Sequence, residues 1–383
     1  MARKSVLILS GFAAVVVVGF SAKAWSAPTP VLASNGAVCT IVGTAGDDVL
    51  NGTASANVIC GLGGSDTING LAGNDVIDAG SGNDTIYGGV GNDTIDPGTG
   101  TDSVSGDAGT NTVYYGASSA DLTVNLATGS TAGSGFADTL TGIQNLTSGS
   151  GNDTISGSAV ANIIDAGSGN DTISADLGND TIKGGDGTDT VDFSAITVNV
   201  TANLATGSTS GAGTDKVSAI ENIIGGSGND TLTGNANNNV LAGAAGNDTI
   251  NPSIGTDTVN GGVGTDVLSL ATQTIDTTVN LLTGTATAAN LTDTITGVEN
   301  VTTGTGNDTI TGDGNNNVLN GGAGDDIIDP NTGTDTVTGG TGTNAVSFGS
   351  VSVDLNISLT SNKATGANIS DKFTGIVNVT GGS

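Results

Sequence analysis

Isolated aliphatic residues recur at every ninth position over most of the chain, and small or polar residues surround each of them. From Gly43 the sequence divides into nine-residue units such as GLGGSDTIN and GGVGNDTID, and position 8 of each unit is Leu, Ile or Val. Positions 1 to 6 are mostly Gly, Asn, Asp and small residues, which favour tight turns. Positions 7 to 9 form a β-prone triplet whose middle side chain alone points inward, because successive side chains of a strand point to opposite faces. Each unit therefore predicts a turn followed by a very short strand.

The units are grouped into blocks, and the segments between the blocks also repeat. Eight units fill the first block without a slip and five units fill each of three later blocks, which gives 23 units in all. The spacer asparagines Asn145, Asn222, Asn300 and Asn378 lie 77, 78 and 78 residues apart. We expect this order along the chain: signal peptide 1–24, lead-in 25–42, block 43–114, spacer 115–147, block 148–192, spacer 193–224, block 225–269, spacer 270–302, block 303–347 and terminal spacer 348–383.

The nine-residue period predicts the architecture. Two units make one flattened coil of eighteen residues, and successive coils stack as parallel strands in which each repeat contacts its neighbours. We therefore expect an all-β chain: a parallel β-roll, or β-solenoid, of glycine- and aspartate-rich nonapeptide repeats, interrupted by longer solenoid spacers.

The N-terminus has the pattern of an export signal. Arg3 and Lys4 precede an apolar run at 6–20, and an A-x-A cleavage site ends at Ala24, with Ala27 as a second possible site. A retained membrane anchor is the alternative, but fifteen residues fall short of the eighteen or more that a spanning helix needs. The prediction is a protein that is secreted or held at the cell surface, without membrane insertion after cleavage of the signal.

Two cysteines agree with export. Cys39 and Cys60 are the only cysteines of the chain, and an oxidising compartment favours a disulfide between two thiols so close in sequence. Such a bridge closes a loop of about 22 residues and contributes about 3 kcal/mol in the chain-entropy model. Two free buried thiols are the alternative, and metal binding by two Cys without His is a weaker one.

The composition excludes several classes of partner. The formal net charge is −30, there are 65 glycines and no histidine, and only 3% of the residues are aromatic. Nucleic acids and anionic membranes are bound chiefly through Lys and Arg, so neither is expected as a partner. General acid–base and nucleophilic constellations are scarce without His, so we do not expect an enzyme. Glu221 and Glu299 lie in spacers, where we expect a packing role or a turn contact.

The unit at 88–96, GGVGNDTID, resembles the nonapeptide G-G-x-G-x-D-x-U-x of repeat-in-toxin (RTX) proteins, also called hemolysin-type calcium-binding proteins. It matches every fixed position, and the spacers resemble the linkers of the same family. The resemblance implies a β-roll that holds calcium between turns through the aspartate at position 6 and the carbonyls of the glycine-rich turn. The chemistry agrees, because Ca²⁺ takes six to eight oxygen ligands and needs neither imidazole nor thiolate.

The resemblance implies a set of calcium ligands, although Asn-Asp-Thr also forms simple turns. The candidates are the position-6 aspartates Asp48, Asp66, Asp75, Asp84, Asp93, Asp102, Asp153, Asp171, Asp180, Asp189, Asp230, Asp248, Asp257, Asp266, Asp308, Asp326 and Asp335. Units two apart are expected on the same edge, so these carboxylates should form rows. Six units carry asparagine there instead and are expected to bind weakly or not at all: Asn57, Asn111, Asn162, Asn239, Asn317 and Asn344.

These observations favour an exported calcium-binding structural or cell-surface module whose β-roll folds on binding several Ca²⁺ ions. The alternative is a calcium-dependent adhesin that binds a repetitive surface such as a glycan, a mineral or ice. Besides calcium, the candidate partners are a surface polymer and a second copy of the chain meeting it through the solenoid ends.

Overall fold

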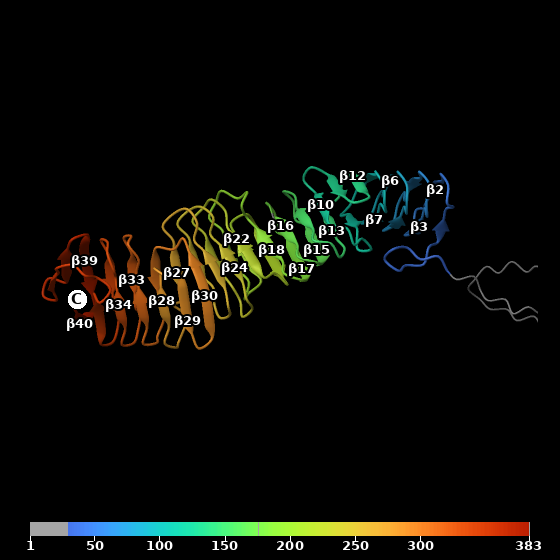
Figure 1. Ribbon diagram of the computed structural model, residues 1–383. Coiled ribbons are helices and arrows are strands. Elements are labelled where there is room, and N and C mark those ends of the chain that lie inside the picture. The colour runs from blue at the N-terminus through green and yellow to red at the C-terminus, as the bar shows by residue number, and fades with distance from the viewer. Residues whose placement is uncertain (1–29, 175, 383) are drawn as a thin grey trace, which may run out of the picture.

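The computed structural model describes residues 30–382 except residue 175, and the predicted signal peptide lies outside it. Every regular element of this part is a β-strand, and no helix in it could cross a membrane. The strands stack into a long rod in which the chain advances steadily from one end to the other (Figure 1).

Two twenty-stranded sheets form the two faces of the rod, and the chain alternates between them. The first sheet contains, in spatial order, β1 (Ile41–Val42), β3 (Val58–Cys60), β5 (Val76–Asp78), β7 (Thr94–Asp96), β9 (Thr112–Tyr114), β13 (Asn145–Thr147), β15 (Ile163–Ser168), β17 (Thr181–Asp186), β21 (Thr214–Ser218), β20 (Ser208–Ser210), β19 (Thr201–Asn203), β23 (Thr231–Thr233), β25 (Thr249–Asn251), β27 (Val267–Ser269), β31 (Asn300–Thr302), β33 (Val318–Asn320), β35 (Thr336–Thr338), β39 (Ile369–Thr374), β38 (Lys363–Gly366) and β37 (Asn356–Ser358).

The second sheet contains, in spatial order, β2 (Val49–Asn51), β4 (Thr67–Asn69), β6 (Thr85–Tyr87), β8 (Ser103–Ser105), β12 (Phe136–Thr141), β11 (Ser130–Gly133), β10 (Leu122–Asn125), β14 (Thr154–Ser156), β16 (Thr172–Ser174), β18 (Thr190–Asp192), β22 (Asn222–Ile224), β24 (Val240–Ala242), β26 (Thr258–Asn260), β30 (Leu291–Thr296), β29 (Thr285–Ala288), β28 (Thr278–Asn280), β32 (Thr309–Thr311), β34 (Ile327–Asp329), β36 (Asn344–Ser347) and β40 (Ile376–Thr380).

The strand register within the blocks is eighteen residues, as the sequence predicts. Leu50 of β2 pairs in parallel with Ile68 of β4, and Ile59 of β3 pairs with Ile77 of β5. One coil therefore consists of two nonapeptides, one on each sheet. The expected parallel β-roll is confirmed.

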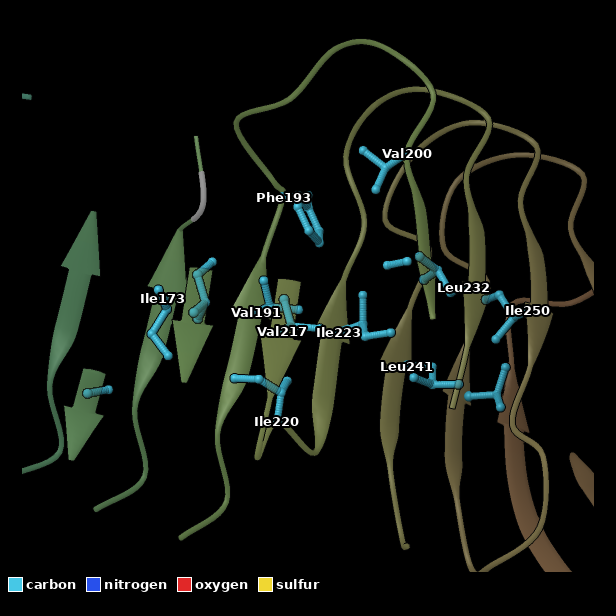
Figure 2. Packing of buried hydrophobic residues seen from close by; sticks show 14 of the residues in the cluster. Ile173, Val191, Phe193, Val200, Val217, Ile220, Ile223, Leu232, Leu241 and Ile250 are labelled. Atoms are coloured by element: carbon cyan, nitrogen blue, oxygen red, sulfur yellow. The ribbon is translucent and has the colours of Figure 1, made fainter. Parts of the chain in front are cut away.

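The core is a narrow double row of aliphatic side chains between the sheets. From Ile59 to Val346, every position-8 side chain is at most 1% exposed, whereas Leu50 in the first coil is partly exposed. Figure 2 shows these side chains pointing from both sheets into the shared interior, for example Ile173, Leu232 and Leu241. Each nonapeptide strand from β3 onward buries one large aliphatic side chain, so the apolar layer is thin.

The spacers add antiparallel strands to an otherwise parallel stack. In the first spacer the chain first forms β10, which pairs with β14 of the following block. It then runs back towards the preceding block through β11 and β12, and β12 pairs with β8. We call each such β-strand trio a meander. The four meanders are β10–β12, β19–β21, β28–β30 and β37–β39, and they lie alternately in the second and the first sheet. The residue that opens each spacer is large and fully buried: Tyr115, Phe193, Leu270 and Phe348.

The lead-in is tied to the first coils. Cys39 and Cys60 form a disulfide with their Cα atoms 6.0 Å apart, and no free cysteine lies in the described part of the chain. Strand β1 pairs with β3, so the bridge joins neighbouring coils.

Candidate metal-binding turns

The position-6 aspartates form rows along the two edges of the roll, where the turns join the sheets. Within a row, one carboxylate oxygen of each candidate aspartate except Asp48 accepts a hydrogen bond from a backbone N–H on the preceding strand of the same sheet. Asp66 N–H donates to Asp84 Oδ1 at 2.7 Å, and Asp84 N–H donates to Asp102 Oδ1 at 2.7 Å. The same pattern links Asp230, Asp248 and Asp266. The turns thus fix each carboxylate through its Oδ1 atom and leave Oδ2 for another contact.

In most units the second carboxylate oxygen is buried without any hydrogen-bond donor. Fourteen of the seventeen candidate aspartates have such an Oδ2 atom: Asp66, Asp75, Asp84, Asp93, Asp102, Asp171, Asp180, Asp189, Asp248, Asp257, Asp266, Asp308, Asp326 and Asp335. Burying a charged oxygen without a partner raises the free energy of the folded chain, so a proton or a cation is needed to stabilise these positions.

The other three candidates, Asp48, Asp153 and Asp230, are satisfied within their own turns. Asp48 Oδ2 accepts from Thr44 N–H at 2.6 Å, Asp153 Oδ2 accepts from the Ser148 hydroxyl, and Asp230 Oδ2 accepts from Gly226 N–H at 2.6 Å. Each of the three is the first aspartate of its row, and its Oδ2 atom already has a hydrogen-bond donor in the same turn.

The backbone at position 2 separates the two kinds of turn. In thirteen of the fourteen units with a partnerless Oδ2, the position-2 residue has a positive φ, and Asp308 at the start of its block is the exception. Leu62 and Leu71 adopt φ values of +77° and +76°, a left-handed conformation that costs a leucine about 1 to 2 kcal/mol. Strain of this kind persists at functional sites. In the self-satisfied turns the position-2 N–H points at the carboxylate instead.

Where position 6 is asparagine, the amide takes the place of one or the other carboxylate oxygen. Asn239 Nδ2 donates to the Glu221 carbonyl at 2.7 Å, and Asn317 Nδ2 donates to the Glu299 carbonyl at 2.7 Å, each one coil earlier, while their Oδ1 atoms accept the position-2 N–H of their own turns. Asn111 differs, because its Oδ1 accepts from Asp93 N–H and its Nδ2 donates to the Gly142 carbonyl one coil later at 3.0 Å. In Asn111 the amide nitrogen therefore lies where the aspartate Oδ2 has no donor.

Backbone carbonyls converge on the same places as the partnerless oxygens. A Cβ atom added to Gly88 would lie 2.6 Å from Asp93 Oδ2 and 2.9 Å from the carbonyl oxygen of Gly106. Glycine at position 1 thus leaves a carboxylate oxygen and a carbonyl oxygen facing one space. Within residues 30–382 no three Asp, Glu, His or Cys side chains gather into a metal site, and the donor set at each turn is a carboxylate together with main-chain oxygens. Oxygen donors of this kind suit a hard cation such as Ca²⁺.

Burial raises the pKa of the row carboxylates. The pKa of Asp84 is raised to about 6, first by burial and then by repulsion from Asp66, against a backbone hydrogen bond that lowers it. Burial raises the pKa of Asp102 and of Asp335 to about 7, and the neighbouring carboxylates Asp138 and Asp371 add to it. Without a cation, these buried carboxylates therefore ionise at a higher pH than exposed ones, at about pH 6 to 7.

Sequence reasoning missed the residues that continue each row into the spacer. Four buried spacer aspartates accept the N–H of the last aspartate in a row: Asp138, Asp215, Asp293 and Asp371. Gln144, Glu221 and Glu299 end the other rows in the same way. The glutamates thus make the turn contact that was one of their expected roles. A signal was present, since ADTLT, TDKVS, TDTIT and SDKFT keep the D-x-apolar spacing of positions 6 to 8.

The family model described as RTX calcium-binding nonapeptide repeat (4 copies) matches more than half of the chain, over residues 40–68, 61–95, 95–119, 138–173, 147–182, 165–195, 217–250, 253–269, 293–328 and 302–337. No curated protein matches. Among solved structures, the chain is similar to a hyperactive, Ca²⁺-dependent, β-helical antifreeze protein from an Antarctic bacterium, with 17% identity over 80% of this chain and 86% of that one, and a TM-score of 0.15.

Proposed function

Because the chain belongs to the family of RTX calcium-binding nonapeptide repeat proteins, we propose that it is an exported structural or cell-surface module whose β-roll folds as Ca²⁺ ions fill its aspartate rows. The observation that carries this proposal is the set of fourteen buried Oδ2 atoms without a donor. Each lies at a turn whose other groups are oxygens, and calcium is the cation that the family description names.

Coupling between calcium and folding follows from the balance between the core and the charge. Each nonapeptide buries at most one large aliphatic side chain while nine residues are ordered, so the apolar core is small for the length of chain that it orders. The rows bring many carboxylates to coil spacing in a chain of formal charge −30. Ions that bind only the folded chain stabilise it by mass action, so calcium binding would contribute folding free energy that the thin core does not provide.

Export and a non-enzymatic role belong to the same proposal. The Cys39–Cys60 disulfide is of the kind that persists in oxidising compartments, where calcium is millimolar. The chain contains no histidine, and its buried carboxylates are already committed to the backbone of the turns. The proposed role is therefore binding and scaffolding, without catalysis.

A calcium titration followed by circular dichroism tests the proposal. The decalcified protein at pH 7.5 should lack β-structure, and added CaCl₂ should produce a cooperative rise of the β-signal. NaCl at the same ionic strength is the control, because it screens charge without occupying the rows. A full β-spectrum in the decalcified protein at pH 7.5, unchanged by calcium, would refute the coupling of folding to calcium.

A further inference from the structure

The four meanders provide a matched set of sites within one chain. Each contains a buried aspartate whose cross-strand partner on the neighbouring antiparallel strand is also buried. The pairs are Thr131 with Asp138, Thr209 with Asp215, Ala286 with Asp293 and Ala364 with Asp371. Backbone geometry is shared by all four, so a difference between them comes from the side chains.

In the first two meanders, hydroxyl groups satisfy the aspartate. Asp138 Oδ2 accepts from the Tyr115 hydroxyl at 2.8 Å, and Tyr115 in turn contacts the Thr131 hydroxyl at 2.8 Å. Asp215 Oδ2 accepts from the Thr209 hydroxyl at 2.5 Å. Both rows are thus closed by donors that belong to the protein.

In the last two meanders those donors are missing. Ala286 and Ala364 replace the threonines, and Leu270 and Phe348 stand where Tyr115 stands in the first spacer. Asp293 is 2% exposed and Asp371 is 1% exposed, and the Oδ2 atoms of both lack any hydrogen-bond partner. Both are buried carboxylates, and no hydrogen-bond donor of the protein compensates the charge on Oδ2.

Each of these aspartates also adjoins a second carboxylate of the same kind. Asp257 N–H donates to Asp293 Oδ1 at 3.0 Å, and Asp335 N–H donates to Asp371 Oδ1 at 3.1 Å. The Oδ2 atoms of Asp257 and Asp335 are themselves buried without donors. Two buried carboxylates side by side cannot both stay ionised without a cation.

We propose that the third and fourth meanders each hold one calcium ion in addition to the row ions, at the Oδ2 atoms of Asp293 and Asp371 beside the row carboxylates of Asp257 and Asp335, whereas hydroxyl groups replace that ion in the first two. The inference rests on the proposed function, because it assumes that calcium fills the block rows. It extends the metal sites from the nonapeptide blocks into the spacers and makes a hydroxyl donor to the aspartate, from Tyr115 or Thr209, the determinant of occupancy.

Crystal structures of the full chain grown in CaCl₂, with anomalous data to identify calcium, test this assignment. Besides the row ions, one ion is expected on the Oδ2 atom of Asp293 and one on that of Asp371, and none on the Oδ2 atom of Asp138 or Asp215. Block-row ions without any ion at Asp293 or Asp371 would overturn this inference and leave the proposed function standing. Rows without any calcium would overturn both.

Exchange of the determinant residue gives an independent test in solution. Ala286→Thr supplies the hydroxyl found at Thr209, so the variant should bind one calcium ion fewer than the wild type in equilibrium dialysis. Thr209→Ala removes that hydroxyl beside Asp215 and should bind one ion more. Asp293→Asn should match Ala286→Thr in losing one ion. Unchanged stoichiometry in folded Ala286→Thr and Thr209→Ala variants would refute the determinant, and a proton shared by Asp257 and Asp293 would then explain the pair.

Discussion

The third block (225–269) and the spacer that follows it (270–302) differ in how their buried polar groups find partners. Most block turns bury a carboxylate oxygen that no group of the protein hydrogen-bonds, and they use residues with positive φ to do so. Meander strands pair in antiparallel fashion and bury side chains such as Leu291 and Ile295. In the proposed function the blocks therefore depend on an external cation, while the meanders satisfy most of their polar groups by strand pairing, with Asp293 as the exception.

The contrast teaches where cation dependence originates. It does not come from the acidic composition alone, because Asp165 is exposed on the sheet surface and pairs with Lys183 at 3.1 Å. It comes from a turn that removes an N–H from the carboxylate. Gly226 donates that N–H to Asp230, and one coil later Ala244, with φ of +72°, does not donate to Asp248.

The largest expected effect is that of pH on the decalcified protein, because it acts on every block row together. Burial raises the pKa of Asp84, Asp171, Asp248 and Asp326 to about 6, above the ordinary value of 3.8. A raised folded-state pKa means that protonation favours the folded chain, so this stabilisation is complete below pH 3.8 and is lost as pH rises through 6.

Circular dichroism of the decalcified protein should therefore show more β-structure at pH 4.5 than at pH 7.5. With saturating calcium the order should reverse, because the ions require ionised carboxylates. Equal β-content at both pH values without calcium would contradict the claim that the block rows resist ionisation.

A smaller effect is expected from one methyl group in a block turn compared with one in a meander hairpin. Gly91 has φ of +152°, and its added Cβ would strike the Gly73 carbonyl oxygen; Gly135 has φ of +89° with no atom within 4 Å. In calcium, Gly91→Ala should lose about 3 to 5 kcal/mol of unfolding free energy. Gly135→Ala should lose only about 1 to 2 kcal/mol. Urea unfolding measures both, and equal losses would remove the distinction between the two kinds of turn.

The smallest effect concerns a single carboxylate. Asp84→Asn should lower the unfolding free energy by about 1 to 2 kcal/mol in calcium, because a ligand is lost. At pH 7.5 without calcium the variant should resist unfolding better than the wild type, since an amide can bond the carbonyl of the next coil as Asn111 does. Asp165→Asn, on the exposed face, is the matched control and should change stability by less than about 0.5 kcal/mol in either condition. Loss of stability in both conditions would indicate simple packing damage.

The sequence predicts the block architecture in detail, because period alone places Ile59, Ile68 and their equivalents in the core. It also predicts the aspartate rows, since residues eighteen apart must stack. The meanders were not predicted: a strand that returns antiparallel has no period of its own. Asp293 was missed because its unit begins with Ala288 where glycine was expected, and only stacking on Asp257 identifies its place. The turn strain at Leu62 is invisible in sequence, because leucine does not favour positive φ.

The alternation of the meanders between sheets bears on the straightness of the rod. Each meander adds three strands to one sheet, while the same stretch of the rod gains only one strand in the opposite sheet. The sheet with three added strands is longer there, so the rod should bend with that sheet on its convex side. A five-unit block spans two and a half coils, and this half turn delivers the next meander to the opposite face. Whether a block has an odd or an even number of units therefore decides the direction of the next bend. Blocks of five units make successive bends cancel, whereas blocks of four or six units would make them add and curve the rod into an arc.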